Sequence, residues 1–199
     1  MNRRQLIIGG AIAVVAIGLG WALMSGLFRV LRDTEPPEPG RPAATATPTP
    51  APGEPAVPRI KATLYFGSED GRYLVPVEQE IPLAEGAVAQ ARAIVEAQLS
   101  STPPQPLAPT IPPETKLRGL YLSAKNEAFV DLDAAVRKNH PGGSMNELFT
   151  VYTIVNAVTT NLADVQSVQV LIDGREVDTL AGHVDLRRPL RKNESLIAP

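Results

Sequence analysis

The segment from Ser144 to Gly174 limits the fold more than any other part of the sequence, because it predicts a long helix followed at once by a strand. Ser144 and Glu147 have the spacing of a capping box, in which the hydroxyl and the carboxylate each bind a free backbone N–H at the helix start. Apolar residues recur at helical spacing up to Leu162, so a helix over about 145–162 has one apolar face. A capped helix that leads into a buried strand predicts a layered domain.

The strand after this helix is predicted at about 167–172, where every second residue is valine or isoleucine. Asp173 and Gly174 form a turn signal, so the strand ends there or opens a hairpin with a short return strand at 177–180. We expect the chain from Arg187 onwards to be polar and loosely held at its end.

Earlier elements repeat a strand–strand–helix order. Pro76 lies inside the second strand and removes a hydrogen-bond donor, so this strand is expected at a sheet edge. The loop at 101–113 is too rich in proline to continue a helix. The predicted elements are strands at 60–66 and 73–80, a helix at 86–99, and strands at 116–123 and 128–132. The order β-β-α-β-β-α-β(-β) predicts an α+β fold with two helices on one face of a mainly antiparallel sheet.

An uncharged apolar run at 6–28 precedes this domain. It has about 23 residues, or roughly 35 Å of helix, which is enough to cross a bilayer core of about 30 Å. We expect an uncleaved transmembrane anchor with residues 1–5 in the cytoplasm. A cleaved secretory signal is the alternative, with small residues near Ala43 as its cleavage site. Arg3 and Arg4 before the apolar run also resemble a twin-arginine export signal.

Residues 29–58 are rich in proline and threonine and have almost no apolar bulk, so they form a linker rather than a core. Arginines flank the apolar run on both sides, and the charge rule therefore gives no clear orientation. Proline- and threonine-rich spacers are typical of extracytoplasmic stalks, which places the domain at 59–190, with its tail at 191–199, on the periplasmic or cell-wall side. A flexible tether with no length requirement is the alternative.

The composition excludes several classes of function. The net charge is −2 and there is no basic run, so the chain lacks the electrostatic footprint of a nucleic-acid-binding protein. It also has no cysteine, which excludes disulfides, thiolate metal sites, cysteine nucleophiles and attachment of a lipid to cysteine.

Three groups of residues could carry chemistry or binding. Ser144 and His140, with Asp131 or Asp133, suggest a hydrolase, but no G-x-S-x-G elbow is present and loop structure is favoured. His183 and Asp185 lie on one face of an extended segment, which suits a structural hydrogen bond better than a metal site with too few ligands.

Aromatic residues form the third group. They could line a sugar-binding face, although aromatics on periodic elements more often belong to a core. The candidates are Tyr65, Tyr121, Phe129 and Tyr152. Asn156, close to the apolar stripe of the second helix, either binds across to the sheet or marks a contact surface.

Several motifs resemble those of the GerMN domain of sporulation and spore-germination proteins. The most specific are ELFTVYTIVN at 147–156 and LAGHVDL at 180–186, and the resemblance covers about 61–189. It implies an extracytoplasmic, membrane-tethered, non-catalytic domain, with a fold like the ring-building modules of the sporulation channel. The best-known members are lipoproteins with two tandem domains, whereas this chain is expected to have an anchor and one domain.

These observations predict a scaffold domain in an envelope assembly. It would act through another envelope protein or through self-association, at the strand edge beside Pro76 or at the final hairpin. The alternative is a module that binds peptidoglycan or another wall polymer, and an envelope hydrolase using His140 or His183 is a third hypothesis. We expect no catalytic, metal or cofactor site.

Overall fold

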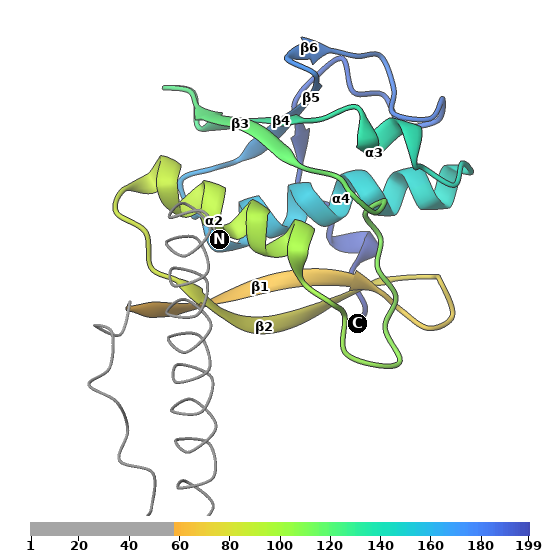
Figure 1. The fold of residues 1–199 in the computed structure, drawn as a ribbon, viewed down its shortest axis with the longest axis horizontal. Coiled ribbons are helices and arrows are strands. Elements are labelled where there is room, and N and C mark those ends of the chain that lie inside the picture. Colours follow the sequence, from red (N-terminus) through yellow and green to blue (C-terminus); the bar gives the residue numbers. More distant parts are fainter. Residues whose placement is uncertain (1–57) are drawn as a thin grey trace, which may run out of the picture. The chain divides into compact units, whose positions relative to one another are not determined.

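The computed structural model describes residues 58–199 (Figure 1). The predicted anchor at 6–28 and the linker up to residue 57 lie outside the described residues. The elements are β1 (Arg59–Gly67), β2 (Leu74–Pro82), α2 (Ala87–Ser100), β3 (Leu117–Leu122), β4 (Glu127–Leu132), α3 (Ala135–Lys138), α4 (Ser144–Asn161), β5 (Ser167–Ile172), β6 (Arg175–Glu176), β7 (Leu190–Arg191) and the 3₁₀ helix η1 (Glu194–Leu196). Within this region, none of the helices has the length and hydropathy of a membrane-spanning segment.

The two long helices form the middle layer between two sheets (Figure 1). On one side lies the antiparallel hairpin β1–β2. On the other lies a five-stranded sheet in the order β3-β4-β5-β6, with β7 paired to another part of β5. The strands β4 and β5 run parallel, and α4 makes the crossover between them.

Two hydrophobic clusters hold these layers together. The larger lies between the helices and the five-stranded sheet and includes Val151, Val155 and Val158 of α4. The smaller lies against the hairpin and includes Phe149 and Ala157 of the same helix. Because α4 is apolar on two opposite faces, it packs against a sheet on each side.

The α+β class and the predicted order of long elements are confirmed. The strands, however, form two sheets instead of one, because the second apolar face of α4 needs its own cover. The region 133–143, where no helix or strand was predicted, contains the one-turn helix α3. The return strand is the two-residue β6 and not 177–180, because the segment after it is bound elsewhere, as described below.

The outer edge of β1 is completed by side chains of the helices. The Gln98 amide accepts a hydrogen bond from the Tyr65 N–H (2.8 Å) and donates one to the Tyr65 carbonyl (2.9 Å). Asn161 binds the N–H and the carbonyl of Thr63 in the same way, both at 2.8 Å. Each amide therefore takes the place of a peptide group in a neighbouring strand.

The C-terminal residues are docked, contrary to the expectation of a loose end. Asn156 donates to the Asn193 carbonyl (3.2 Å) and accepts from the Asn193 N–H (3.0 Å). Leu196 is buried against the hairpin cluster, and the Ala198 N–H donates to the Leu74 carbonyl. Asn156 thus binds neither the sheet nor an external surface but the end of its own chain.

Candidate functional site

A buried carboxylate in the first turn of α4 forms the most highly connected polar site in the described region. The side chain of Glu147 has no exposed surface. Its Oε1 accepts hydrogen bonds from the N–H groups of Leu180 and Ala181, both at 2.8 Å. Its Oε2 accepts the N–H of His183 at 2.7 Å and lies 3.1 Å from the ring Nδ1 of the same residue.

The segment that Glu147 binds is also held from the other side. Arg137 of α3 donates to the carbonyl oxygens of Thr179 (2.6 Å) and Leu180 (3.1 Å). Gly182 has a φ of +103°, which lets the chain turn its successive N–H groups toward one carboxylate. We call residues 179–183 the latched segment, because an anion holds its N–H groups and a guanidinium holds its carbonyls.

The environment keeps Glu147 ionised. Burial by itself would raise the pKa of this carboxyl, but the backbone N–H groups and the His183 ring outweigh it and hold the pKa below the ordinary value of 4.5. A carboxylate with its oxygens occupied in this way is a poor proton donor at neutral pH, and its role is to organise the latched segment.

This arrangement corrects two predictions. The predicted capping box at Ser144 and Glu147 does not form, because Gly143 takes the N-cap position and no side chain caps the helix. Glu147 instead satisfies N–H groups that would otherwise be buried without acceptors. The His183–Asp185 pair does not form either, because Asp185 binds Arg187 at 2.8 and 2.9 Å while His183 binds Glu147.

The residues of the hydrolase hypothesis are engaged separately. Asp131 accepts from the Gly174 N–H (2.7 Å), and Asp133 accepts from the Lys116 N–H (3.0 Å). His140 accepts the Gly142 N–H through Nδ1 (2.9 Å). Among the described residues, no hydrogen bond joins Ser144, His140 and either aspartate. Nor do residues 58–199 contain three or more His, Asp or Glu side chains grouped to hold a metal ion.

The predicted aromatic face is only partly assembled. Tyr65 is 2% exposed and belongs to the hairpin cluster, and Tyr152 packs against both clusters. Tyr121 is 62% exposed and pairs across the strands with Phe129, which is half-buried. Two of the four candidates therefore meet at the surface, on the face of the five-stranded sheet opposite the helices.

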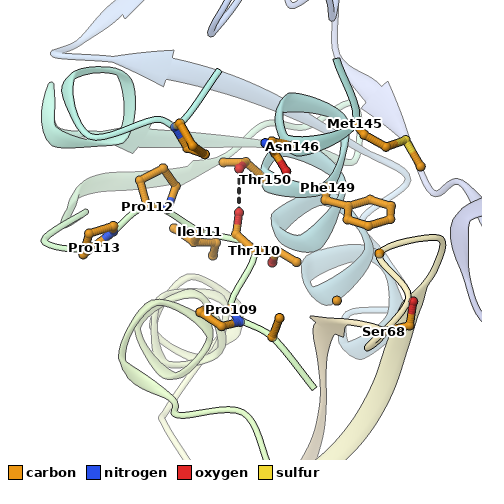
Figure 2. Close-up of a pocket in the computed structure, with 14 residues that line it drawn as sticks. Ser68, Pro109, Thr110, Ile111, Pro112, Pro113, Met145, Asn146, Phe149 and Thr150 are labelled. Atoms are coloured by element: carbon orange, nitrogen blue, oxygen red, sulfur yellow. Dashed lines mark hydrogen bonds between the residues drawn. The ribbon is translucent and has the colours of Figure 1, made fainter. Parts of the chain in front are cut away.

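A cavity of about 270 Å³ lies between the β1–β2 turn, the proline-rich loop and the start of α4 (Figure 2). Two of its polar side chains already have partners: the Thr150 hydroxyl donates to the Thr110 carbonyl (2.6 Å), and the Asn146 amide donates to the Gly142 carbonyl (2.8 Å). The remaining lining is largely apolar and includes Pro109, Pro112, Pro113, Met145 and Phe149. The sequence predicted a loop here but carried no signal that the loop walls a cavity.

Comparison with known proteins supports the resemblance found in the sequence. A family model described as "Germane: Sporulation and spore germination" matches residues 63–178. No curated protein matches the chain.

Three solved structures align with this chain, and the one with a TM-score of 0.50 shows the fold. The tandem GerMN domains of the sporulation protein GerM from Bacillus subtilis align with a TM-score of 0.50 at 15% identity, over 68% of this chain and 46% of that chain. The first GerMN domain of the same protein gives 0.49 at 16% identity, over 67% and 96% of the two chains. A candidate lipoprotein from Clostridium perfringens gives 0.47 at 24% identity, over 70% and 92%.

Proposed function

This chain belongs to the Germane family of sporulation and spore-germination domains, and from that premise we propose that it is a membrane-tethered, non-catalytic interaction domain outside the cytoplasm. The family match over residues 63–178 is the observation that carries the proposal. The partner would be another protein of the cell envelope or a further copy of this chain.

The role of the two family motifs supports a non-catalytic function. The motif at 147–156 supplies Glu147, and the motif at 180–186 supplies the N–H groups that this carboxylate binds. The two motifs that carry the resemblance are therefore used to bind one another. What remains for function is the surface that this internal framework presents.

The N-terminal sequence supports tethering. The uncharged run at 6–28 is long enough for one bilayer crossing, and the linker at 29–58 has the composition of an extended spacer. An anchor and spacer of this kind would hold the domain at a distance from the bilayer while confining it to the membrane surface.

The tethering is tested with the full chain fused at its C-terminus to alkaline phosphatase, which is active only outside the cytoplasm, or to green fluorescent protein as the matched reporter. We expect phosphatase activity and a membrane fraction that detergent releases but alkaline carbonate does not. Release of the chain by carbonate, or fluorescence of the green fluorescent protein fusion without phosphatase activity of the other fusion, would contradict the proposed tethering.

The scaffold role is tested by cross-linking the full chain in membranes and comparing it with a chain that ends after residue 58. We expect higher-mass complexes only when the domain is present. A His140→Ala, His183→Ala double variant is expected to keep these complexes, and their retention would count against the hydrolase hypothesis, which needs one of the two histidines.

Binding to a wall polymer is a second candidate, favoured by the exposure of Tyr121 beside Phe129. An aromatic side chain on an exposed sheet face can stack on a sugar ring. The full chain in detergent is mixed with purified sacculi and sedimented. Retention that is lost in Tyr121→Ala would support this function, and retention unaffected by that change would not.

A further inference from the structure

We propose that the solvent-facing side of β3 and β4 binds a neutral sugar ring, which stacks on Tyr121 and forms hydrogen bonds with Asp131 and Arg118. The inference rests on the second candidate function, binding to a wall polymer. It deepens that function by naming the sugar chain of the polymer, and not its peptides, as the part that is bound. It also adds a polar half to the aromatic pair from which that function was argued.

Tyr121 presents one face of its ring to solvent. The residue is 62% exposed although it lies within a strand of a packed sheet. A Cβ placed on Gly119 would lie 3.1 Å from the ring carbon Cε2 and 3.1 Å from the hydroxyl oxygen, so the ring lies across this glycine and covers it. The strand therefore supports one face of the ring and leaves the other face free for a ligand.

Phe129 widens this aromatic surface. It pairs with Tyr121 across the two strands and is half-buried. The long helices lie against the opposite face of the sheet (Figure 1). A sugar ring has an apolar face of C–H groups, and an exposed aromatic ring is a surface on which this face can be buried.

A carboxylate with a free oxygen lies on the same side of the sheet. Asp131 pairs with Gly119 across the strands, so it lies toward the hydroxyl end of the Tyr121 ring. Its Oδ1 accepts the Gly174 N–H at 2.7 Å, which fixes the orientation of the carboxylate. Its Oδ2 accepts no hydrogen bond from residues 58–199, and Arg118 Nε is 3.8 Å away, beyond hydrogen-bond distance. This oxygen can therefore accept a hydrogen bond from a ligand.

Arg118 supplies donors beside that acceptor. Its Nη1 donates to Asp173 Oδ1 at 2.7 Å, which holds the guanidinium next to Asp131. A guanidinium has five N–H donors, and within the described region this is the one hydrogen bond that Arg118 donates through its side chain. The side chain is 45% exposed. Free donors and a free acceptor thus lie side by side at the edge of the aromatic surface.

This combination fits an uncharged sugar. A hydroxyl group both donates and accepts, so neighbouring hydroxyls of one sugar ring can bind Asp131 and Arg118 together. A carboxylate or phosphate would be repelled by Asp131 and Asp173, and an ammonium group by Arg118. The charges of the site therefore favour a neutral polyol, and the exposed ring favours one with an apolar face.

The test is a calorimetric titration of the full chain in detergent with a soluble β-1,4-linked N-acetylglucosamine oligomer, a sugar chain that carries no peptide. Tyr121→Ala removes the stacking surface and should weaken binding at least about tenfold. Tyr121→Phe keeps the ring and should bind within about threefold of the wild type. Arg118→Gln removes the charged donors and should weaken binding about fivefold.

Tyr73→Ala is the matched control. Tyr73 also lies beside an arginine, since the Arg72 guanidinium is 5.9 Å from the centre of its ring, but this pair belongs to the turn of the β1–β2 hairpin. Binding by Tyr73→Ala should equal that of the wild type. Urea unfolding of each variant shows that the domain remains folded.

Weaker binding in both Tyr121→Ala and Arg118→Gln, with Tyr73→Ala unaffected, would support the sugar site. No binding of the oligomer by the folded wild type would overturn it. Wild-type affinity in Tyr121→Ala would overturn it too, because the ring would then have no part in binding.

Failure of wall-polymer binding itself looks different, because intact sacculi carry both sugar chains and peptides. Retention on sacculi that depends on Tyr121, without affinity for the oligomer, would overturn the sugar as the ligand and leave wall binding intact. Affinity for the oligomer that depends on Tyr121, without retention on sacculi, would support the sugar site and reject the cell wall as the source of its ligand.

Discussion

At the scale of single residues, Glu147 determines the course of a segment more than thirty positions later in the chain. Three backbone N–H groups and one imidazole converge on its two oxygens. Hydrogen bonds to a charged acceptor are about twice as strong as neutral ones, and the burial of Glu147 leaves water no access to replace them. The latched segment therefore depends on this one carboxylate.

Replacing Glu147 is expected to destabilise the domain strongly. Glu147→Ala leaves several buried N–H groups without an acceptor, which predicts a loss of about 3–5 kcal/mol in the free energy of unfolding. Glu147→Gln keeps one acceptor oxygen and should cost about 2 kcal/mol. Urea unfolding checks both. Glu96→Gln, at an exposed ion pair on α2, is the control and should change stability by less than about 0.5 kcal/mol. A Glu147→Ala variant with the same free energy of unfolding as the wild type would contradict the role of Glu147 in holding the latched segment.

The same site predicts acid sensitivity. Because the folded state holds the pKa of Glu147 below its ordinary value of 4.5, its stabilisation is fully present above pH 4.5. It is lost as the pH falls from there through the folded pKa. The stability difference between the wild type and Glu147→Gln should therefore shrink as the pH falls from 7 to 3.

Subtracting the free energy of unfolding of Glu147→Gln from that of the wild type removes the contribution of all other acids. The pKa of Asp70 is lowered by its hydrogen bond from Ser68, and that of Asp185 by Arg187, and both contribute equally to the two proteins. Urea titrations at several pH values give the difference. A difference that stays constant from pH 7 to 3 would show that ionisation of Glu147 does not matter.

The error over Glu147 has a physical origin. The S-x-x-E pattern is a local signal, and it predicted the start of α4 correctly to within one residue. The carboxylate nevertheless binds N–H groups that follow it by 33 to 36 positions. A capping pattern carries no information about such distant competitors, whereas a buried acid inside an apolar helix face could have indicated one.

At the scale of elements, side-chain amides replace missing strands. Gln98 and Asn161 each bind both the N–H and the carbonyl of one β1 residue, and Asn156 binds Asn193 in the same manner. The contacts of Gln98 and Asn161 fix α2 and α4 to the hairpin and keep the outer edge of β1 closed to other strands.

Removing one of these amides is expected to open the β1 edge. Gln98→Met keeps the size of this buried side chain but leaves the N–H and carbonyl of Tyr65 unpaired, which predicts a loss of about 2 kcal/mol. Thermal and urea unfolding give this value. Gln166→Met, at an exposed position, should be within about 0.5 kcal/mol of the wild type. Equal stability of the two variants would contradict the role of Gln98.

The helices and long strands were predictable because their signals are local. The alternation of apolar and polar residues predicted β1 and β5, and the helical spacing of apolar residues predicted α2 and α4, all within one or two residues. The division into two sheets was not predictable, because it depends on α4 packing through both Val155 and Ala157. A periodic pattern gives the width of an apolar face but not the number of layers that cover it.

At the scale of the whole domain, the C-terminal segment crosses all three layers. The strand β7 pairs with β5 of the five-stranded sheet. Asn193 then binds Asn156 of the helix layer, and Ala198 binds Leu74 of the hairpin. One short segment therefore connects both sheets through the helices.

A chain that ends at Lys192 is expected to lose this connection. It leaves the fully buried Asn156 amide without partners, which predicts about 1–3 kcal/mol, and removes buried Leu196, worth about 2 kcal/mol. A chain that ends at Ala198 keeps every one of these contacts and should match the wild type.

If the loss of stability comes from the contact between Asn156 and Asn193, Asn156→Ala should cost far less in the chain that ends at Lys192 than in the full chain, because its partner is already gone. Urea unfolding of the full chain and the shortened chain, each with and without Asn156→Ala, measures this coupling. Purely additive losses would mean that the two ends of the contact act independently.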